Sequence, residues 1–327
     1  MLNLTLEQLR EENKLRKFTF LGIILVIVGA VGAFTFLDDA FETVDIFEEK
    51  KVSGNQYKNI EIDTSSVDVN VIPTAKKELI VTLSGEVSKR YEEVYDLVLE
   101  ERGDMLQIEL KEKNIFFNVG FVINKVDLQV EIPQKLYDSV KVDVTSGDID
   151  VAQLQANDLT LSTSSGDVTI EELNASDVEL TATSGNISAK NGVISSNMLI
   201  ETSSGDIDTE NIISNILTLE VTSGNIEFTN NEVKTSTLQT SSGNITIYND
   251  EHKGDIKAKT TSGDITIDFE QENESLLIDF KTSSGDVDIR REGYLFEEKS
   301  DSKAIGKIGS GKYNIEARAS SGDITLK

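Results

Sequence analysis

The stretch Thr145-Ser146-Gly147-Asp148-Ile149 decides the fold, because the chain writes it nine times with small changes. The glycines of the nine copies are Gly147, Gly166, Gly185, Gly205, Gly224, Gly243, Gly263, Gly285 and Gly322. By subtraction, successive glycines lie 19, 19, 20, 19, 19, 20, 22 and 37 positions apart. A nearly fixed period in this range is typical of a repeat architecture, in which one small unit stacks on the next.

Each copy is predicted to be two short strands that meet at the Ser-Gly pair. Apolar and polar residues alternate on both sides of the turn, as in Leu159-Thr160-Leu161 and Val168-Thr169-Ile170, which is the period of half-buried strands. Glycine supplies the positive φ of a sharp turn, and an Asp, Asn or Ser beside it hydrogen-bonds local backbone. We therefore interpret the nine glycines as structural turn residues.

A third apolar position follows about seven residues after the glycine, at Leu154, Leu173 and Ile212, with Val193 and Val233 slightly displaced. Each coil is therefore expected to have about three sides, with a perimeter of about 60 Å at ~3.3 Å per residue. The predicted fold is all-β: a parallel β-solenoid of ~19–20-residue coils, right-handed by the crossover rule. An antiparallel meander or sandwich is the alternative, but such folds do not keep one turn sequence at one period.

The chain before the repeats contains one apolar stretch, residues 18–37, FTFLGIILVIVGAVGAFTFL, which carries no charge. At ~1.5 Å per residue it is long enough to cross the ~30 Å hydrocarbon layer as a helix. Basic residues precede it and acidic residues follow it, which places the N-terminus in the cytoplasm and the rest outside. A cleavable signal peptide, with Val31 and Ala33 at the cleavage site, is the alternative. The length of the stretch favours a retained single-pass anchor from Phe18 to Leu37.

The predicted organisation is a cytoplasmic segment (1–17), a transmembrane helix (18–37), an acidic stalk (38–58), an irregular β part that caps the solenoid (59–139), and regular repeats (140–327) with a degenerate coil at 290–312. Within the irregular part, Thr64-Ser65-Ser66-Val67 looks like the repeat turn without its glycine. An open solenoid end needs such a cap, because it exposes unpaired strand edges.

Composition excludes several kinds of site. The chain has no cysteine and one histidine, His252, so disulfides, thiolate zinc sites and histidine clusters are absent. Subtracting the four basic and three acidic residues of the first 17 from totals of 31 and 58 leaves 27 basic and 55 acidic residues, a net charge of −28. Such a surface repels nucleic acid and attracts cationic peptides or basic protein domains. No cofactor is predicted.

Three chemistries are alternatives to a purely structural role of the repeated residues. Acid pairs such as Asp148 with Asp150, Asp206 with Asp208 and Asp286 with Asp288 suggest a polysaccharide-active enzyme, but repeated acids share one environment and their pKa values do not separate. The column after the glycine suggests calcium binding, but it holds Asn as well as Asp. Flat Thr ladders suggest ice or carbohydrate binding, but the column three before the glycine mixes Thr, Val and Ala. We predict no catalytic and no metal-ligating residues.

The anchor and the Ser-Gly-Asp/Asn-Ile coils together resemble the bacterial putative-adhesin family of unknown function, the LiaG-like membrane-anchored envelope proteins. The features that carry this resemblance are Ile60 to Ser66, the strand end Val130-Glu131-Ile132-Pro133 followed by Tyr137, and the Thr-Ser-Ser-Gly-Asp runs. It covers about residues 59–327. The resemblance implies a β-strand-repeat ectodomain in the envelope of Gram-positive-type bacteria, sometimes associated with envelope-stress loci.

The sequence thus predicts a non-catalytic, membrane-anchored extracellular β-solenoid that acts as a cell-envelope scaffold, adhesin or interaction module. The alternative is an accessory of an envelope-stress sensing system that binds a regulator or a cationic peptide. A polysaccharide-active β-helix enzyme is a minor alternative. The expected partners are the membrane, through Phe18 to Leu37, and envelope proteins or cationic peptides, with no nucleic acid.

Overall fold

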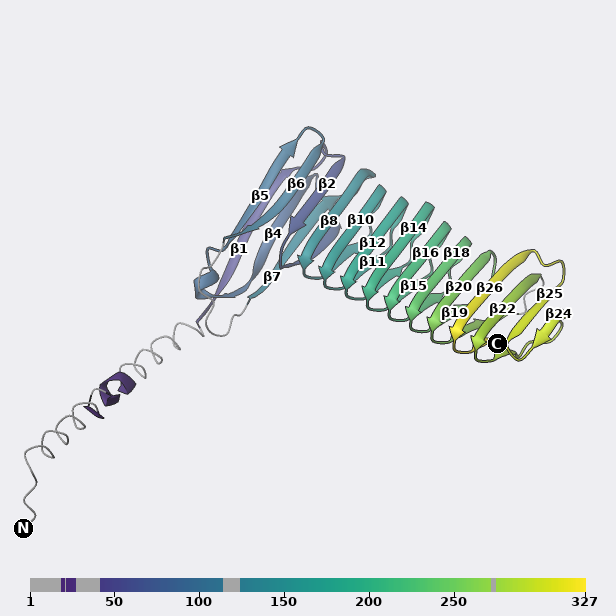
Figure 1. Cartoon of the computed structure of the whole chain (residues 1–327). Coiled ribbons are helices and arrows are strands. Elements are labelled where there is room, and N and C mark those ends of the chain that lie inside the picture. The colour runs from purple at the N-terminus through teal and green to yellow at the C-terminus, as the bar shows by residue number, and fades with distance from the viewer. Residues whose placement is uncertain (1–18, 21, 28–41, 114–123, 272–274) are drawn as a thin grey trace, which may run out of the picture. The chain divides into compact units, whose positions relative to one another are not determined.

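The computed structural model describes residues 19–20, 22–27, 42–113, 124–271 and 275–327 (Figure 1). The chain divides into two compact units. The larger comprises Phe47–Ser84, Tyr95–Lys113 and Val126–Lys327, and the smaller comprises Met1–Ile46, Gly85–Val94 and Asn114–Lys125. The described part of the smaller unit includes the 3₁₀-helix η1 (Lys89–Tyr91), and Lys89 Nζ lies 2.7 Å from Glu42 Oε1.

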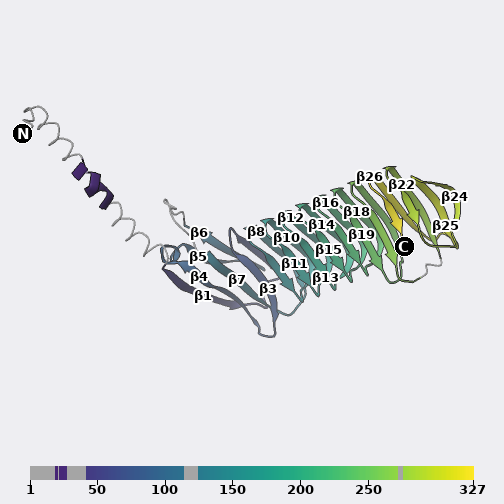
Figure 2. The same cartoon turned by 90° about the horizontal axis from the view of Figure 1, so that it is seen from below.

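The strands of the described residues form two sheets (Figures 1 and 2). The first runs, in spatial order, β1 (Thr43–Ser53), β4 (Glu78–Ser88), β7 (Asn124–Pro133), β3 (Asp68–Thr74), β9 (Ile149–Ala152), β11 (Val168–Glu171), β13 (Ile187–Lys190), β15 (Ile207–Glu210), β17 (Ile226–Thr229), β19 (Ile245–Asn249), β21 (Ile265–Phe269), β27 (Ile324–Leu326), β23 (Val287–Ile289). The second runs β24 (Leu295–Ser300), β25 (Lys303–Ile308), β22 (Leu276–Ser284), β26 (Tyr313–Ser321), β20 (Asp255–Ser262), β18 (Glu232–Ser242), β16 (Ile213–Ser223), β14 (Val193–Ser204), β12 (Asn174–Ser184), β10 (Gln155–Ser165), β8 (Tyr137–Ser146), β2 (Asn59–Thr64), β6 (Met105–Glu112), β5 (Tyr95–Arg102).

From β8 to β21, each coil places one longer strand in the second sheet and one shorter strand in the first. Consecutive coils pair in parallel with like residues opposite one another, so that Leu161 faces Leu180 and Val168 faces Ile187. The prediction of an all-β fold with parallel stacked coils is confirmed. The stacking follows from the period, because equal coil lengths bring the same column of residues into register every time.

The core is the space between the two sheets. The apolar column five positions before the glycine is fully buried at Leu161, Leu180, Ile200 and Leu219, and the β-branched column two positions after the glycine is buried in every copy. Fully burying one such side chain contributes about 1.5–3 kcal/mol. A ladder of identical apolar residues therefore stabilises each coil mainly through its two neighbours.

The second corner of each coil lies between the short strand and the next long strand. Five non-glycine residues have positive φ here, between 49° and 57°: Gln153, Glu172, Asn191, Asn211 and Asn230. The apolar residues that follow at Leu154, Leu173 and Ile212 are buried, as is Val233, whereas Val193 is 48% exposed. The expectation for Val193 is wrong, because Gly192 occupies the corner in that coil and Ile194 turns inward.

The predicted third side appears as a bend inside the long strand. In β10 the buried positions are Ala156, Leu159, Leu161 and Thr163, so the inward parity changes between residues 156 and 159. The same bend interrupts the register of β12 with β14 between Ala175 and Val178. Each coil thus has two sheet segments and one bend.

The first coil consists of β2 and β3, which are joined by the glycine-free turn at Ser65. Strand β2 pairs in parallel with β8, and the Ser146 amide donates to the Ser65 carbonyl at 2.7 Å. Strands β6 and β7 lie on the outer side of β2 and β3 although they come later in the sequence. The N-terminal end is therefore covered by a coil that the chain adds after the first one.

The last coil is inserted between two earlier ones. Strand β26 pairs with β20 on one side and β22 on the other, and β27 lies between β21 and β23. The turn at Gly322 is thus stacked between those at Gly263 and Gly285. All turns share one chemistry, so the sequence alone does not order them.

Two segments differ from prediction. Residues 43–53, assigned to an acidic stalk, form strand β1, in which exposed and half-buried residues alternate and Val44, Ile46 and Val52 lie on the half-buried face. Residues 290–312, assigned to a degenerate coil, hold instead the antiparallel hairpin of β24 and β25, which adds to β22 at the edge of the second sheet.

The predicted membrane span falls largely outside the described residues. Residues 19–20 and 22–27 are helical. In the part of the chain that the structure describes, no helix reaches the length and apolar character that crossing a membrane requires.

Candidate functional site

The glycine turns form a column in which backbone contacts backbone. From Gly166 to Gly322 their φ values lie between +132° and +159°. A Cβ added to any of these glycines would lie 1.8–2.2 Å from the carbonyl oxygen of the adjacent turn glycine. At Gly147 the same contact, 2.3 Å, is made to the Val67 carbonyl of the glycine-free turn. Only glycine fits such a column.

The acidic and amide residues after the glycines form a second column that ties each coil to the next. One side-chain oxygen accepts the backbone N–H of the equivalent residue in the neighbouring coil, at 2.7–2.9 Å. The chain of bonds runs through Asp68, Asp148, Asp167, Asn186, Asp206, Asn225, Asn244, Asp264, Asp323 and Asp286. Aspartate and asparagine both offer this oxygen, which explains why the column mixes them.

The threonines three positions before the glycine face inward. Thr163, Thr202 and Thr240 are buried, and their hydroxyls donate to the carbonyls of Gly147, Gly185 and Gly224 at 2.9–3.2 Å. Val144 and Ala182 occupy the same column and are also buried. The mixed column is therefore an interior position and presents no flat hydroxyl surface to solvent.

The acid pairs considered for catalysis lie at exposed or half-buried positions of the coils, where two of their members form ion pairs. Asp208 lies 3.6 Å from Lys190 and Asp288 lies 2.7 Å from Arg290. Burial raises the pKa of Asp150, and Asp148 adds to the effect. Within the described residues, no group of three or more His, Cys, Asp or Glu side chains is placed to hold a metal ion.

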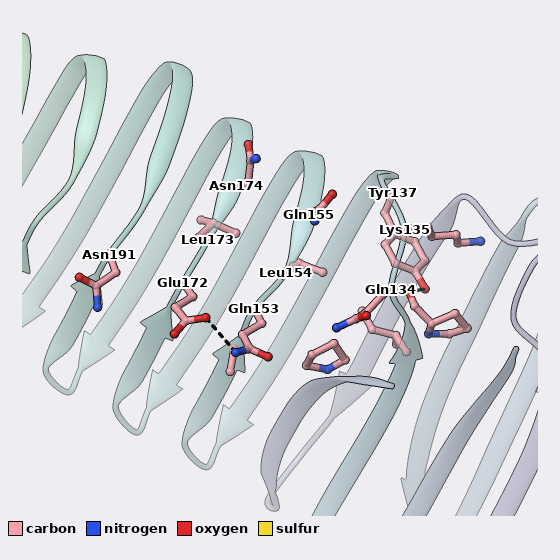
Figure 3. A pocket seen from close by; sticks show the side chains of 14 residues that line it. Gln134, Lys135, Tyr137, Gln153, Leu154, Gln155, Glu172, Leu173, Asn174 and Asn191 are labelled. Carbon is pink, nitrogen blue, oxygen red and sulfur yellow. Dashed lines mark hydrogen bonds between the residues drawn. The ribbon is translucent and has the colours of Figure 1, made fainter. Parts of the chain in front are cut away.

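A groove of about 490 Å³ lies at the second corner, beside the N-terminal coils (Figure 3). We call it the corner groove and define it by five carboxamide side chains: Gln134, Gln153, Gln155, Asn174 and Asn191. Gln155 and Asn174 occupy equivalent places on β10 and β12, and Leu154 and Leu173 lie behind them (Figure 3). Gln153 Nε2 donates to Glu172 Oε2 at 2.8 Å. The groove thus presents carboxamide donors and acceptors, and Lys135 and Glu172 are the charged residues of its lining.

The rim of the corner groove is held by Lys135 and Tyr137. The Lys135 ammonium donates to the Gly54 carbonyl at 2.8 Å and also to the Tyr57 carbonyl, and its Nζ lies 4.8 Å from the centre of the Tyr137 ring. Burial lowers the pKa of Lys135 and raises that of Tyr137. The Tyr137 hydroxyl donates to the Pro133 carbonyl at 3.0 Å. The Lys135 ammonium and the Tyr137 hydroxyl thus both donate hydrogen bonds to backbone carbonyls.

A buried polar cluster, which sequence reasoning missed, replaces the apolar second corner farther along. Asn231 stands where other coils have Leu or Ile, and its Nδ2 donates to the Thr209 carbonyl at 3.0 Å. Asn249 Oδ1 accepts the Asn231 amide at 3.1 Å. His252 Nε2 lies 2.7 Å from the Gly254 carbonyl and its ring stacks on Phe269 at 5.1 Å. Burial lowers the pKa of His252. In the sequence, the replacement of an apolar residue by Asn231 at this corner position is the feature that indicates the cluster.

The comparisons with known proteins agree on a family and a fold. The family model described as Toastrack DUF4097 matches residues 57–215 and 195–327. A putative adhesin from Parabacteroides distasonis is similar in structure, with a TM-score of 0.53 and 11% identity over 86% of this chain and 97% of that one. No curated protein matches the sequence.

Two further solved structures are similar at lower scores. A putative adhesin from Parabacteroides merdae has a TM-score of 0.49 and 11% identity over 85% of this chain and 95% of that one. A putative lipid binding protein from Parabacteroides distasonis has a TM-score of 0.49 and 14% identity over 86% of this chain and 97% of that one.

Proposed function

Because the chain belongs to the Toastrack DUF4097 family, and a structural neighbour of this fold is described as a putative adhesin, we propose that it is a non-catalytic interaction module of the cell envelope. In this role the stacked coils are a rigid support for binding surfaces. The observation that carries the proposal is the corner groove, where repetition of the coil places carboxamides side by side at the second corner.

The chemistry of the corner groove favours a neutral, hydroxyl-rich polymer. A carboxamide both donates and accepts hydrogen bonds, as does a sugar hydroxyl. Neighbouring coils repeat the groups about 4.8 Å apart, so an extended glycan can meet several in succession. The net charge of −27 disfavours anionic polymers at long range but leaves an uncharged glycan unaffected.

The test is calorimetric titration of the protein with uncharged oligosaccharides of N-acetylhexosamine. Saturable binding that weakens at least fivefold in the double variant Gln155→Ala, Asn174→Ala supports the proposal. The matched control is Gln239→Ala, which removes an exposed carboxamide from β18, outside the corner groove. No saturable binding, or equal weakening in the control, refutes a glycan site at the corner groove.

We further propose that residues 18–37 anchor the chain in the cell membrane, with the N-terminus in the cytoplasm and the β-structure outside. The support is the uncharged stretch of 20 residues and the charges that flank it. Protease added to intact cells should remove the β-structure while alkaline carbonate leaves residues 1–37 in the membrane fraction. Release of the whole chain by carbonate would contradict an anchor.

Basic envelope proteins or cationic peptides are the partners that the acidic surface favours.

A further inference from the structure

Strand β1 is an edge strand whose order of charges is complementary to itself. Among the described strands, β1 has one neighbour in its sheet, β4. Its centre reads Glu48-Glu49-Lys50-Lys51, so the same four positions read in the opposite direction carry the opposite charges. None of the other strands that the structure places at a sheet edge, β5, β23 and β24, carries two acids followed by two bases. Opposite charges across two strands stabilise their pairing, and β1 therefore suits an antiparallel copy of itself.

The two faces of β1 limit the registers in which two copies can pair. The even-numbered residues of β1 lie on its half-buried face. A two-fold axis keeps like faces together, so residues that lie opposite each other are both even or both odd. The register centred on Glu49 places Ile46 opposite Val52 and Glu48 opposite Lys50, each pair twice. Moving the centre by one residue places either Glu48 or Lys50 opposite its own copy, so the charges select the register centred on Glu49.

The charged groups of the half-buried face can reach a second copy. Glu48 and Lys50 lie 3.2 Å apart, and their side chains are 41% and 38% exposed. The Lys50 ammonium also donates to the Leu97 carbonyl. An ammonium has three donors and a carboxylate has several acceptor sites. Each of the two side chains can therefore form a further bond to the second copy without losing its bond within the chain.

The exposed face fits the same register. Phe47 is 71% exposed and would lie opposite Lys51 of the second copy, where the lysine stem can cover the ring. Glu49 would lie opposite its own copy, which is the one contact between like charges, and each Glu49 keeps Lys51 as a counter-charge at 2.7 Å. Charges on an edge strand discourage pairing with unrelated strands. In β1 they do so while leaving the antiparallel copy as a matched neighbour.

We propose that two copies of this chain associate through β1, as an antiparallel pair of strands centred on Glu49. The contact uses the same residues on both copies, as a two-fold axis requires. This inference goes beyond the proposed glycan role, because it concerns a different surface and a protein partner. It also gives each assembly two corner grooves, and two linked sites hold a polymer more tightly than one.

The first test measures the mass of the full-length chain in neutral detergent by light scattering after size-exclusion chromatography. We expect a dimer whose dissociation constant rises at least tenfold in Glu48→Lys, which places like charges opposite each other, and returns to the parent value in Glu48→Lys, Lys50→Glu. The matched control is Asp288→Lys in the edge strand β23, where Asp288 lies 2.7 Å from Arg290. Thermal melts establish that each variant is folded. A monomeric parent, a dimer that tolerates Glu48→Lys, or no recovery in the double variant would overturn the proposal.

The second test locates the two-fold axis by cross-linking, since the chain has no cysteine of its own. Opposite residues of an antiparallel pair have Cα atoms about 4.5–5.5 Å apart, within the range of about 4.4–6.8 Å that a disulfide spans. Oxidation with copper phenanthroline should therefore give a covalent dimer of Glu49→Cys. The matched control is Lys51→Cys on the same face, because its two copies would be about 13 Å apart along the strands. No covalent dimer of Glu49→Cys, or equal yields from both variants, would overturn the register, whereas a glycan result at the corner groove would stand.

Discussion

The substitution Gly205→Ala tests whether the glycine column is required by close backbone contact. The added Cβ would lie 2.0 Å from the Gly185 carbonyl oxygen and 2.5 Å from its carbon, whereas an ordinary carbon–oxygen contact is about 3.3 Å. Two stacked coils, normally about 4.8 Å apart, would have to separate by roughly 1 Å. Overpacking of this kind costs about 1–3 kcal/mol, and the φ of +147° adds about 1–3 kcal/mol for a non-glycine residue.

The expected loss in the free energy of unfolding is therefore about 2–6 kcal/mol, measured by urea denaturation followed by far-ultraviolet circular dichroism. Gly103→Ala isolates the backbone contribution, since Gly103 has φ +69° and nothing within 4 Å of its Cβ position. In Gly192→Ala the one tight contact of the added Cβ is with the flexible end of Ile212, at 3.0 Å, and the substitution should cost less than about 1 kcal/mol. A Gly205→Ala protein as stable as Gly103→Ala would refute the steric argument.

Three further predictions concern the stacked columns and the coil order. Asp167→Asn should keep the stability of the parent in urea, while Asp167→Ala should lose about 1 kcal/mol, because only the alanine leaves the Asn186 amide without its acceptor. Equal losses in the two variants would indicate that the charge of Asp167, and not its hydrogen bond, stabilises the protein. Burial lowers the pKa of His252 below its ordinary 6.5, so the unfolded chain binds the proton more readily and stability falls as the pH drops below 6.5. His252→Gln should abolish this part of the pH dependence. Identical curves of stability against pH for the two proteins would contradict the prediction. Deleting residues 313–327 should lower the melting temperature far more than deleting an outermost coil, because the deletion unpairs both β20 and β22 from β26. A melting temperature within a few degrees of that of the parent would contradict the position of the last coil between β20 and β22.

The stacked fold could be predicted because the same few residues meet in every coil. Gly166, Asp167 and Val168 contact their own equivalents in the next coil, so a contact between distant parts of the structure repeats at a fixed sequence separation. The glycine-free turn at Ser65 could be predicted because its sequence resembles the repeat turn, and in the structure its Asp68 accepts the Asp148 amide as the other columns do.

The corner groove and the polar cluster could not be predicted in the same way. The corner groove joins Gln134, which precedes the regular repeats, to Asn191 across several coils. Its repeated positions hold Gln, Glu or Asn, and the sequence does not show that Gln134 lies beside them. His252 lies between β19 and β20 in a coil of ordinary length, and its contact with Tyr313 exists only because the last coil is inserted beside β20.

The sequence by itself determined the coil: its period, its inward-facing columns and its turn chemistry, since these depend on contacts between a residue and its own copies. Only the tertiary structure decided which coil lies beside which at the two ends, and therefore which side chains share a groove. The physical reason is that every Ser-Gly turn accepts any other as a neighbour. At the C-terminal end the hairpin of β24 and β25, which carries no repeat, pairs with β22, and the last coil lies between β20 and β22.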